Sequence, residues 1–163
     1  MAKLKVLTYP DPFLSTKAKA VSEFDAKLEK IAADMLETMY AEEGCGLAAV
    51  QVGLDMRLIV LDVTKEKKQP QIFVNPRIIK TEGSCTESEG CLSVPGYRET
   101  VKRAKVVTVE AFDTKGNRFE IQADGLLGRC LQHECDHLDG ILYVDRISNL
   151  KKHLFKKWFS KHK

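Results

Sequence analysis

The sequence predicts a single α+β domain in which mostly antiparallel strands pack around a central helix with an HExxH motif, with one helix near each end of the chain. Helical periodicity is confined to three segments, and strand-like segments fill the chain between the first two of them. No repeat, low-complexity tract or linker interrupts this order. The composition, with 44% hydrophobic and 30% charged residues, is typical of a compact domain with one core. We therefore expect residues 1–163 to form one domain.

The first helix is predicted over residues 25–41, where apolar side chains recur at spacings of three and four. These side chains are Leu28, Ile31, Met35 and Met39. Ser22 is a candidate N-cap, because a serine hydroxyl can accept a hydrogen bond from a free N–H of the first turn. The helix is expected to end near Ala41.

The strands are predicted next in the chain. Extended runs cover residues 57–63 and 71–79, and two alternating segments follow, KVVTVEAF at 105–112 and RFEIQA at 118–123. Residues 113–117 between the alternating segments are turn-forming and predict a hairpin. Because short connections join antiparallel neighbours, we expect a mostly antiparallel sheet.

The next helix carries the run QHECDHLDG, with Asp124 available as its N-cap and Gly140 as its stop. His133 and His137 are four residues apart, so their imidazoles share one helix face and can converge on one ion. The adjacent Glu134 can reach a water on that ion. The pattern indicates metal-assisted hydrolysis, although HExxH also arises by chance in polar helices, so its surroundings must decide.

The faces of this helix favour a functional Glu134. The residues form two stripes, one of Leu127, Leu131, Glu134 and Leu138 and one of Arg129, Gln132, Asp136 and Asp139. An acid among leucines loses solvation, which raises its pKa. An unpaired buried charge is unfavourable unless a metal or a strong donor accompanies it.

The last helix is predicted over roughly residues 148–160 within a basic tail that carries seven Lys or Arg residues and no acid after Asp145. Its apolar side chains at helical spacing are Leu150, Leu154, Trp158 and Phe159. Three interpretations stay open: a capping helix with a solvated lysine face, a helix that binds the phosphate-rich RNA of the ribosome, and a helix on a membrane surface.

A metal site of this kind needs a third protein ligand, which the residues after the motif do not supply. The HExxHxxGxxH pattern would need a histidine where Tyr143 stands, and no glutamate follows Glu134. Cys130 is seven residues from His137, about 10 Å along a helix axis, and is expected to be a small buried hydrophobe. Upstream, the segment ESEGCLSVPG offers Cys91, whose thiolate suits this class of ion.

Three segments together resemble the peptide deformylase family. GCGLAAVQ, EGCLSVP and QHECDHLDG match the family motifs GxGLAAxQ, EGCLSxP and QHExDHLxG, in the same order, across residues 44–140. GCGLAA alone also matches a dinucleotide-binding fingerprint, but it follows a helix and precedes a strand, which is the wrong context for a Rossmann turn.

The resemblance implies roles for individual residues. Cys91, His133 and His137 would hold one divalent ion, with Fe(II) favoured and Zn(II), Ni(II) or Co(II) possible, and water would be the fourth ligand. Glu134 would take a proton from that water and deliver it to the departing amine. The Gln51 side-chain amide and the Leu92 backbone N–H would stabilise the oxyanion.

The resemblance also implies the substrate, a nascent peptide that begins with N-formylmethionine, and formate as a product. The backbone at Gly46 would pair with the extended peptide, which suits many sequences. Leu126 and Cys130 would face the methionine side chain, and Arg98 would lie near the downstream peptide or remain a solvated charge. The resemblance also favours the ribosome as the partner of the last helix.

Two residues depart from the family pattern. Cys45 stands where the family generally has an aliphatic residue beside the substrate, and we expect its thiol to increase sensitivity to oxidation. Glu87 stands near a pocket wall that is apolar in some relatives, so the residues that line the methionine pocket are open.

The sequence also predicts the compartment. Five cysteines, an odd number, without a secretory signal favour a reducing, cytoplasmic location with thiols in ligand or core positions. No stretch of 18 consecutive apolar residues occurs, so no membrane span is expected. We also expect no DNA partner.

Two other functions are weighed against deformylation. A general HExxH metallopeptidase would share the helix motif but not the Cys91 segment. A non-catalytic metal protein that binds the ribosome would have a closed structural site with four protein ligands, whereas only three convincing ligands are found.

Overall fold

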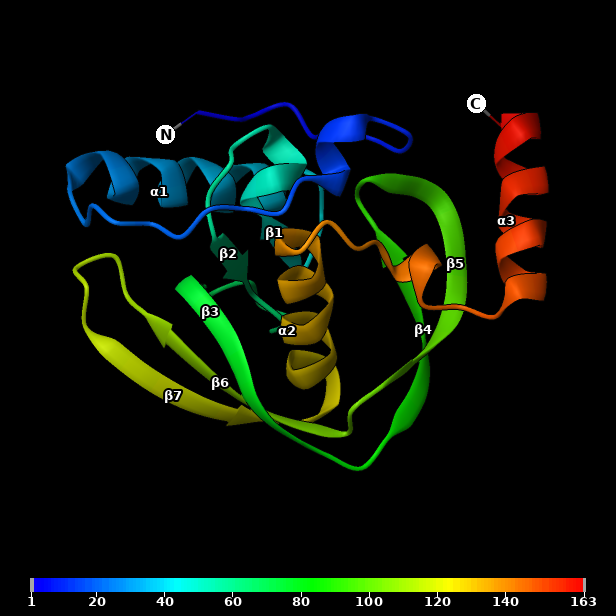
Figure 1. The fold of residues 1–163 in the computed structure, drawn as a ribbon. Coiled ribbons are helices and arrows are strands. Elements are labelled where there is room, and N and C mark those ends of the chain that lie inside the picture. The colour runs from blue at the N-terminus through cyan, green and yellow to red at the C-terminus, as the bar shows by residue number, and fades with distance from the viewer. Residues whose placement is uncertain (1, 163) are drawn as a thin grey trace.

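The computed structural model describes residues 2–162 and confirms the α+β class and the antiparallel strands (Figure 1). The α-helices are α1 (Ala26–Ala41), α2 (Gly125–Leu138) and α3 (Asn149–His162). The strands are β1 (Gly46–Ala48), β2 (Leu58–Leu61), β3 (Gln71–Glu82), β4 (Cys85–Cys91), β5 (Val94–Arg103), β6 (Val106–Phe112) and β7 (Arg118–Ala123).

Five of the strands form one antiparallel sheet in the order β1-β2-β3-β6-β7, so the short strand β1 lies at a sheet edge. β4 and β5 pair only with each other and form a separate two-stranded sheet. In Figure 1 this hairpin lies on the far side of α2 from β7.

Helices cover both faces of the main sheet at β2, whose four residues are all buried. Leu58 and Val60 pack in one core cluster with the apolar side chains of α1, whereas Ile59 and Leu61 pack in another with those of α2. Because successive side chains of a strand point to opposite faces, this alternation places α1 and α2 on opposite sides of the sheet. The helix with the HExxH motif is therefore packed against a buried surface.

The predicted N-cap of the first helix is wrong. Asp25, which directly precedes α1, has an extended backbone, and its side chain accepts a hydrogen bond from Leu28 N at 3.0 Å. Ser22 lies three residues too early to bond an N–H of the first turn. Both residue types can cap a helix, so the apolar periodicity alone did not separate them.

The hairpin of β4 and β5 is missing from the predicted elements, and β3 runs to Glu82 rather than to residue 79. The sequence of β4, CTESEGC, is mostly polar, so it lacks the apolar alternation by which a half-buried strand is recognised. The hairpin is nevertheless important, because it places Cys91 at the end of β4, beside α2.

The last helix is found close to its predicted range and packs beside β5 (Figure 1). Phe155 is buried, and its ring centroid lies 4.9 Å from that of Tyr97. Leu150 and Leu154 remain exposed on the other side of the helix together with several lysines. Within residues 2–162, no helix combines the length and the apolar character needed to cross a membrane.

Candidate metal centre

The three predicted ligands converge at one point between α2 and the β4–β5 hairpin. Their ligand atoms, Cys91 Sγ and one ring nitrogen each of His133 and His137, lie within 4.8 Å of one another. His137 Nε2 is 3.3 Å from His133 Nε2 and 3.3 Å from Cys91 Sγ. These three residues could hold a metal ion.

The surroundings of the two histidines fit a cation. His133 Nδ1 is 2.9 Å from Glu89 Oε1, so the carboxylate favours a proton on Nδ1 and leaves the Nε2 lone pair directed at the centre. Such a carboxylate–histidine pair is the usual support of a metal ligand. His137 is fully buried, and its large loss of hydration on burial lowers its pKa well below the ordinary value. A neutral imidazole is the form that binds metal.

Glu89, which the sequence analysis missed, belongs to a buried charge network. Arg103, 5% exposed, donates to Glu89 through Nε at 2.9 Å and Nη2 at 2.8 Å, and to Asp136 through Nη1 at 2.6 Å. Arg146 donates to the same Asp136. Although burial acts in the opposite direction, the hydrogen bonds from Arg103 and His133 lower the pKa of Glu89 to about 2. Glu89 is therefore a permanent carboxylate behind His133.

We expect Arg103→Met to lower the free energy of unfolding by about 3–5 kcal/mol, because it leaves the buried Glu89 without its arginine and Asp136 with Arg146 alone. Denaturant unfolding measures the loss. Arg118→Met is the matched control, since Arg118 also pairs with two carboxylates, Glu110 and Glu120, but is 49% exposed. Equal destabilisation of the two variants would contradict the structural role of Arg103.

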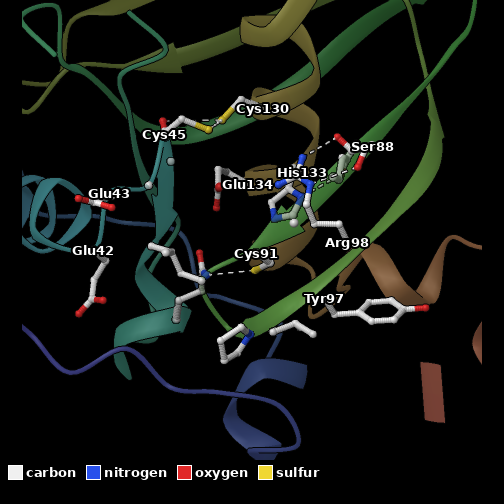
Figure 2. A pocket seen from close by; sticks show the side chains of 18 of the residues that line it. Glu42, Glu43, Cys45, Ser88, Cys91, Tyr97, Arg98, Cys130, His133 and Glu134 are labelled. Atoms are coloured by element: carbon white, nitrogen blue, oxygen red, sulfur yellow. Dashed lines mark hydrogen bonds and ion pairs between the residues drawn. The ribbon is translucent and has the colours of Figure 1, made fainter. Parts of the chain in front are cut away.

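Glu134 projects from α2 into the pocket that Cys91 and His133 also line (Figure 2). It is 4% exposed, and its Oε1 has no hydrogen-bond partner within the described chain, residues 2–162. Burial raises the pKa of Glu134 to about 7. An acid with this pKa can both accept and donate a proton near neutral pH.

Gln51 is held with its amide N–H group toward the ligands. It lies in the 3₁₀ helix Ala49–Val52 and is 1% exposed. Its Oε1 accepts from Ala48 N at 2.9 Å, whereas its Nε2 donates to Ser93 Oγ at 3.1 Å and to Cys91 Sγ at 3.5 Å. Leu92, the other predicted oxyanion residue, follows Cys91 in the turn between β4 and β5.

A pocket of about 710 Å³ opens beside these residues and contains every residue predicted to bind substrate. The lining residues from the prediction are Cys45, Gly46, Arg98, Leu126 and Cys130. Glu87, in contrast, is exposed on β4 and does not line the pocket.

Within the pocket, position 46 has no room for a side chain. A Cβ there would lie 2.7 Å from Glu134 Oε2 and 2.9 Å from Cys130 Sγ. Leu126 is 48% exposed and can be covered by a ligand. Arg98 is exposed at the rim, where its Nη2 donates to Ser88 O at 3.1 Å.

Cys130 is 6% exposed, and its Sγ lies 3.5 Å from Cys45 Sγ (Figure 2). The hydrogen bond with Cys130 lowers the pKa of the Cys45 thiol to about 6, although burial opposes the shift. The sequence did not indicate this contact, because the two cysteines are 85 residues apart.

Comparisons with known proteins indicate one family. The family model described as Polypeptide deformylase matches residues 3–153. A peptide deformylase of Neisseria meningitidis serogroup C is 51% identical over 152 residues, which are 93% of this chain and 91% of the relative. Peptide deformylase 1 of Shewanella oneidensis is 49% identical over 161 residues, which are 99% of this chain and 96% of the relative.

Solved structures give the same result. A peptide deformylase from Legionella pneumophila superposes with a TM-score of 0.93 at 46% identity and covers 99% of this chain and 95% of that one. The peptide deformylase from Synechococcus elongatus in complex with actinonin has a TM-score of 0.90 at 42% identity. The match covers 96% of this chain and 89% of that one.

Proposed function

This chain belongs to the peptide deformylase family of metal-dependent hydrolases, and from that premise we propose how its residues divide the reaction. The reaction removes the formyl group from N-formylmethionine at the amino terminus of newly made polypeptides and releases formate. The observation that carries our assignment is the meeting of Cys91, His133 and His137 within 4.8 Å beside the buried acid Glu134, whose Oε1 has no hydrogen-bond partner within residues 2–162.

Cys91, His133 and His137 hold one divalent ion, for which we propose Fe(II), with Zn(II), Ni(II) and Co(II) as alternatives. When bound, such an ion supplies positive charge that makes water a stronger acid and polarises the formyl carbonyl. Glu89 supports this ligand set through His133, as the 2.9 Å contact with Nδ1 indicates.

Glu134 is the proton carrier of the reaction. It takes a proton from the attacking water as the water oxygen bonds to the formyl carbon, and it then delivers that proton to the departing amine. Its buried position and its pKa of about 7 support both half-steps near neutral pH.

Gln51 and Leu92 stabilise the negative charge that develops on the formyl oxygen. The Gln51 Oε1 contact with Ala48 N fixes the side chain, so its N–H group needs no reorientation during the reaction. The Leu92 backbone N–H is the second donor.

We expect Gln51→Ala to lower kcat by about 10² to 10³-fold, the usual effect of losing one oxyanion donor, with little change in metal content. Formate release from a formyl-methionyl peptide and elemental analysis measure the two quantities. Gln122→Ala, at an exposed position on β7, is the control. A kcat close to that of the unsubstituted protein would remove Gln51 from the mechanism.

The peptide pairs with the free edge of β1 through the backbone at Gly46. β1 ends the five-stranded sheet, so an extended peptide can add to it as a further strand. Such pairing uses main-chain groups and admits many sequences after the first residue. The methionine side chain lies against Leu126, Cys130 and Cys45, and Arg98 contacts the peptide farther downstream.

The partners and the location follow from this substrate. Deformylases act on nascent peptides, and we propose that the exposed lysine side of α3 brings the enzyme to the ribosome, since phosphate-rich RNA attracts such a surface. We propose that the enzyme deformylates nascent peptides in the cytoplasm, as fits the family. We propose no DNA partner.

The direct test of the function is an assay of anaerobically purified protein for formate release from a formyl-methionyl peptide, beside an assay for cleavage of an internal amide in an acetylated peptide. Formate release alone supports the deformylase. Internal cleavage would favour a general metallopeptidase, and the absence of both activities in metal-loaded protein would favour a structural ion.

A further inference from the structure

Two thiols form a pair on the wall of the pocket. Cys45, the residue before β1, and Cys130, on α2, have their Sγ atoms 3.5 Å apart, close enough for a thiol–thiol hydrogen bond (Figure 2). The remaining three cysteines are placed differently. Cys91 is a proposed metal ligand, Cys85 contacts a backbone oxygen, and Cys135 is buried.

The pair borders the pocket. Cys45 is half-buried, Cys130 is buried, and both line the pocket. The strand that follows Cys45 and the helix that carries Cys130 are in direct contact, because a Cβ at Gly46 would lie only 2.9 Å from Cys130 Sγ. A disulfide needs an S–S separation of about 2.05 Å, so the two sulfurs must approach by about 1.5 Å.

We propose that Cys45 and Cys130 are a reversible dithiol site, at which oxidation by a hydroperoxide forms a disulfide on the wall of the methionine pocket and stops deformylation. This inference rests on the proposed function only for its effect on activity. The bond itself follows from the position of the two sulfurs.

The chemistry balances with hydrogen peroxide, the simplest hydroperoxide, as the sole oxidant. The Cys45 thiolate sulfur attacks one peroxide oxygen, the O–O bond breaks, and Cys45 becomes a sulfenic acid while the other oxygen leaves as hydroxide, which takes up the thiol proton and becomes water. The Cys130 sulfur then attacks the sulfenic sulfur, the S–O bond breaks, and a second water leaves as the S–S bond forms. In total, two thiols are oxidised and one hydroperoxide is reduced.

Cys45 is the thiol that reacts first, because it is the more exposed of the two and its pKa is lowered by the hydrogen bond with Cys130. The buried Cys130 resolves the sulfenic acid before further oxidation. The disulfide removes the conformational freedom of two side chains that the methionine side chain would contact, and it tightens the junction of β1 and α2 where the peptide is proposed to pair.

The test oxidises the reduced, metal-loaded enzyme with hydrogen peroxide, alkylates the remaining thiols and digests the protein with trypsin. Mass spectrometry then searches for residues 31–57 joined to residues 130–146, two hydrogens lighter than the separate peptides, with fragmentation to distinguish Cys130 from Cys135. We expect this cross-link to appear, formate release to fall in proportion to the cross-linked fraction, and dithiothreitol to restore both.

Variants separate this reaction from damage to the metal ligands, each compared with its own reduced activity. We expect neither Cys45→Ser nor Cys130→Ser to form the cross-link. Neither variant should show a loss of activity that dithiothreitol reverses. Cys85→Ser, at a half-buried cysteine outside the pocket, should behave as the unsubstituted enzyme.

Absence of the joined peptide, or a joined peptide with undiminished formate release, overturns the proposal. An equal reversible loss in Cys45→Ser also overturns it. Failure of the reduced, metal-loaded protein to release any formate would instead overturn the proposed function, while the peptide map still decides whether the two thiols bond.

Discussion

Glu134→Gln is expected to lower kcat/KM for formate release by about 10² to 10⁴-fold, the contribution of a general acid–base group, while the metal content stays unchanged. Glutamine has the same shape but cannot accept the proton of the attacking water. Because Glu134 Oε1 has no partner within residues 2–162, the substitution breaks no hydrogen bond of that atom.

The measurement compares initial rates on a formyl-methionyl peptide with metal content from elemental analysis. Glu87→Gln is the matched control, since Glu87 is an exposed glutamate on β4 and should keep its activity. A rate loss of less than about tenfold in Glu134→Gln, with the ion still bound, would exclude Glu134 as the general acid–base group.

Cys91→Ala should abolish metal retention and formate release together. Loss of an outer partner of a metal ligand typically lowers metal affinity or activity by about 10 to 100-fold, so removal of the thiolate itself should exceed that range. The same strand supplies a control of the same residue type, Cys85→Ala, whose side chain is directed at Ala104 O rather than at the histidines.

Thermal unfolding gives this prediction a readout that does not depend on catalysis. An ion that binds only the folded state raises the melting temperature. Added Zn(II) should therefore raise the melting temperature of the chelator-treated protein and of Cys85→Ala, and leave that of Cys91→Ala almost unchanged. Similar shifts in all three proteins would show that Cys91 is not a ligand.

The sequence was most informative where local geometry determines the contact. The i,i+4 spacing of His133 and His137 brings two rings together on any helix. No residue after the motif can supply the third metal ligand, so an upstream residue, Cys91, was the candidate. Gly140 follows α2 with φ at +77°, a conformation that glycine adopts without strain, so the helix end was also readable.

Contacts made by the tertiary fold could not be predicted in the same way. Charged residues are usually exposed, so nothing local marks Glu89, Arg103 and Asp136 as a buried network; they meet only when α2 packs beside the β4–β5 hairpin. The contact between Cys45 and Cys130 likewise depends on β1 lying against α2. The hairpin itself was missed because its first strand, CTESEGC, is mostly polar and shows no alternation of apolar and polar residues.

The separation of the β4–β5 hairpin from the main sheet has an energetic consequence. Cys91 and His137 are 46 residues apart and belong to different layers of the molecule. An ion bound by both would therefore connect the two-stranded ribbon of β4 and β5 to the core. Affinity for the cation and docking of the ribbon are then a single linked equilibrium. Loss of the ion should loosen the ribbon first, which amide hydrogen exchange along β4 would detect as faster exchange than along β2.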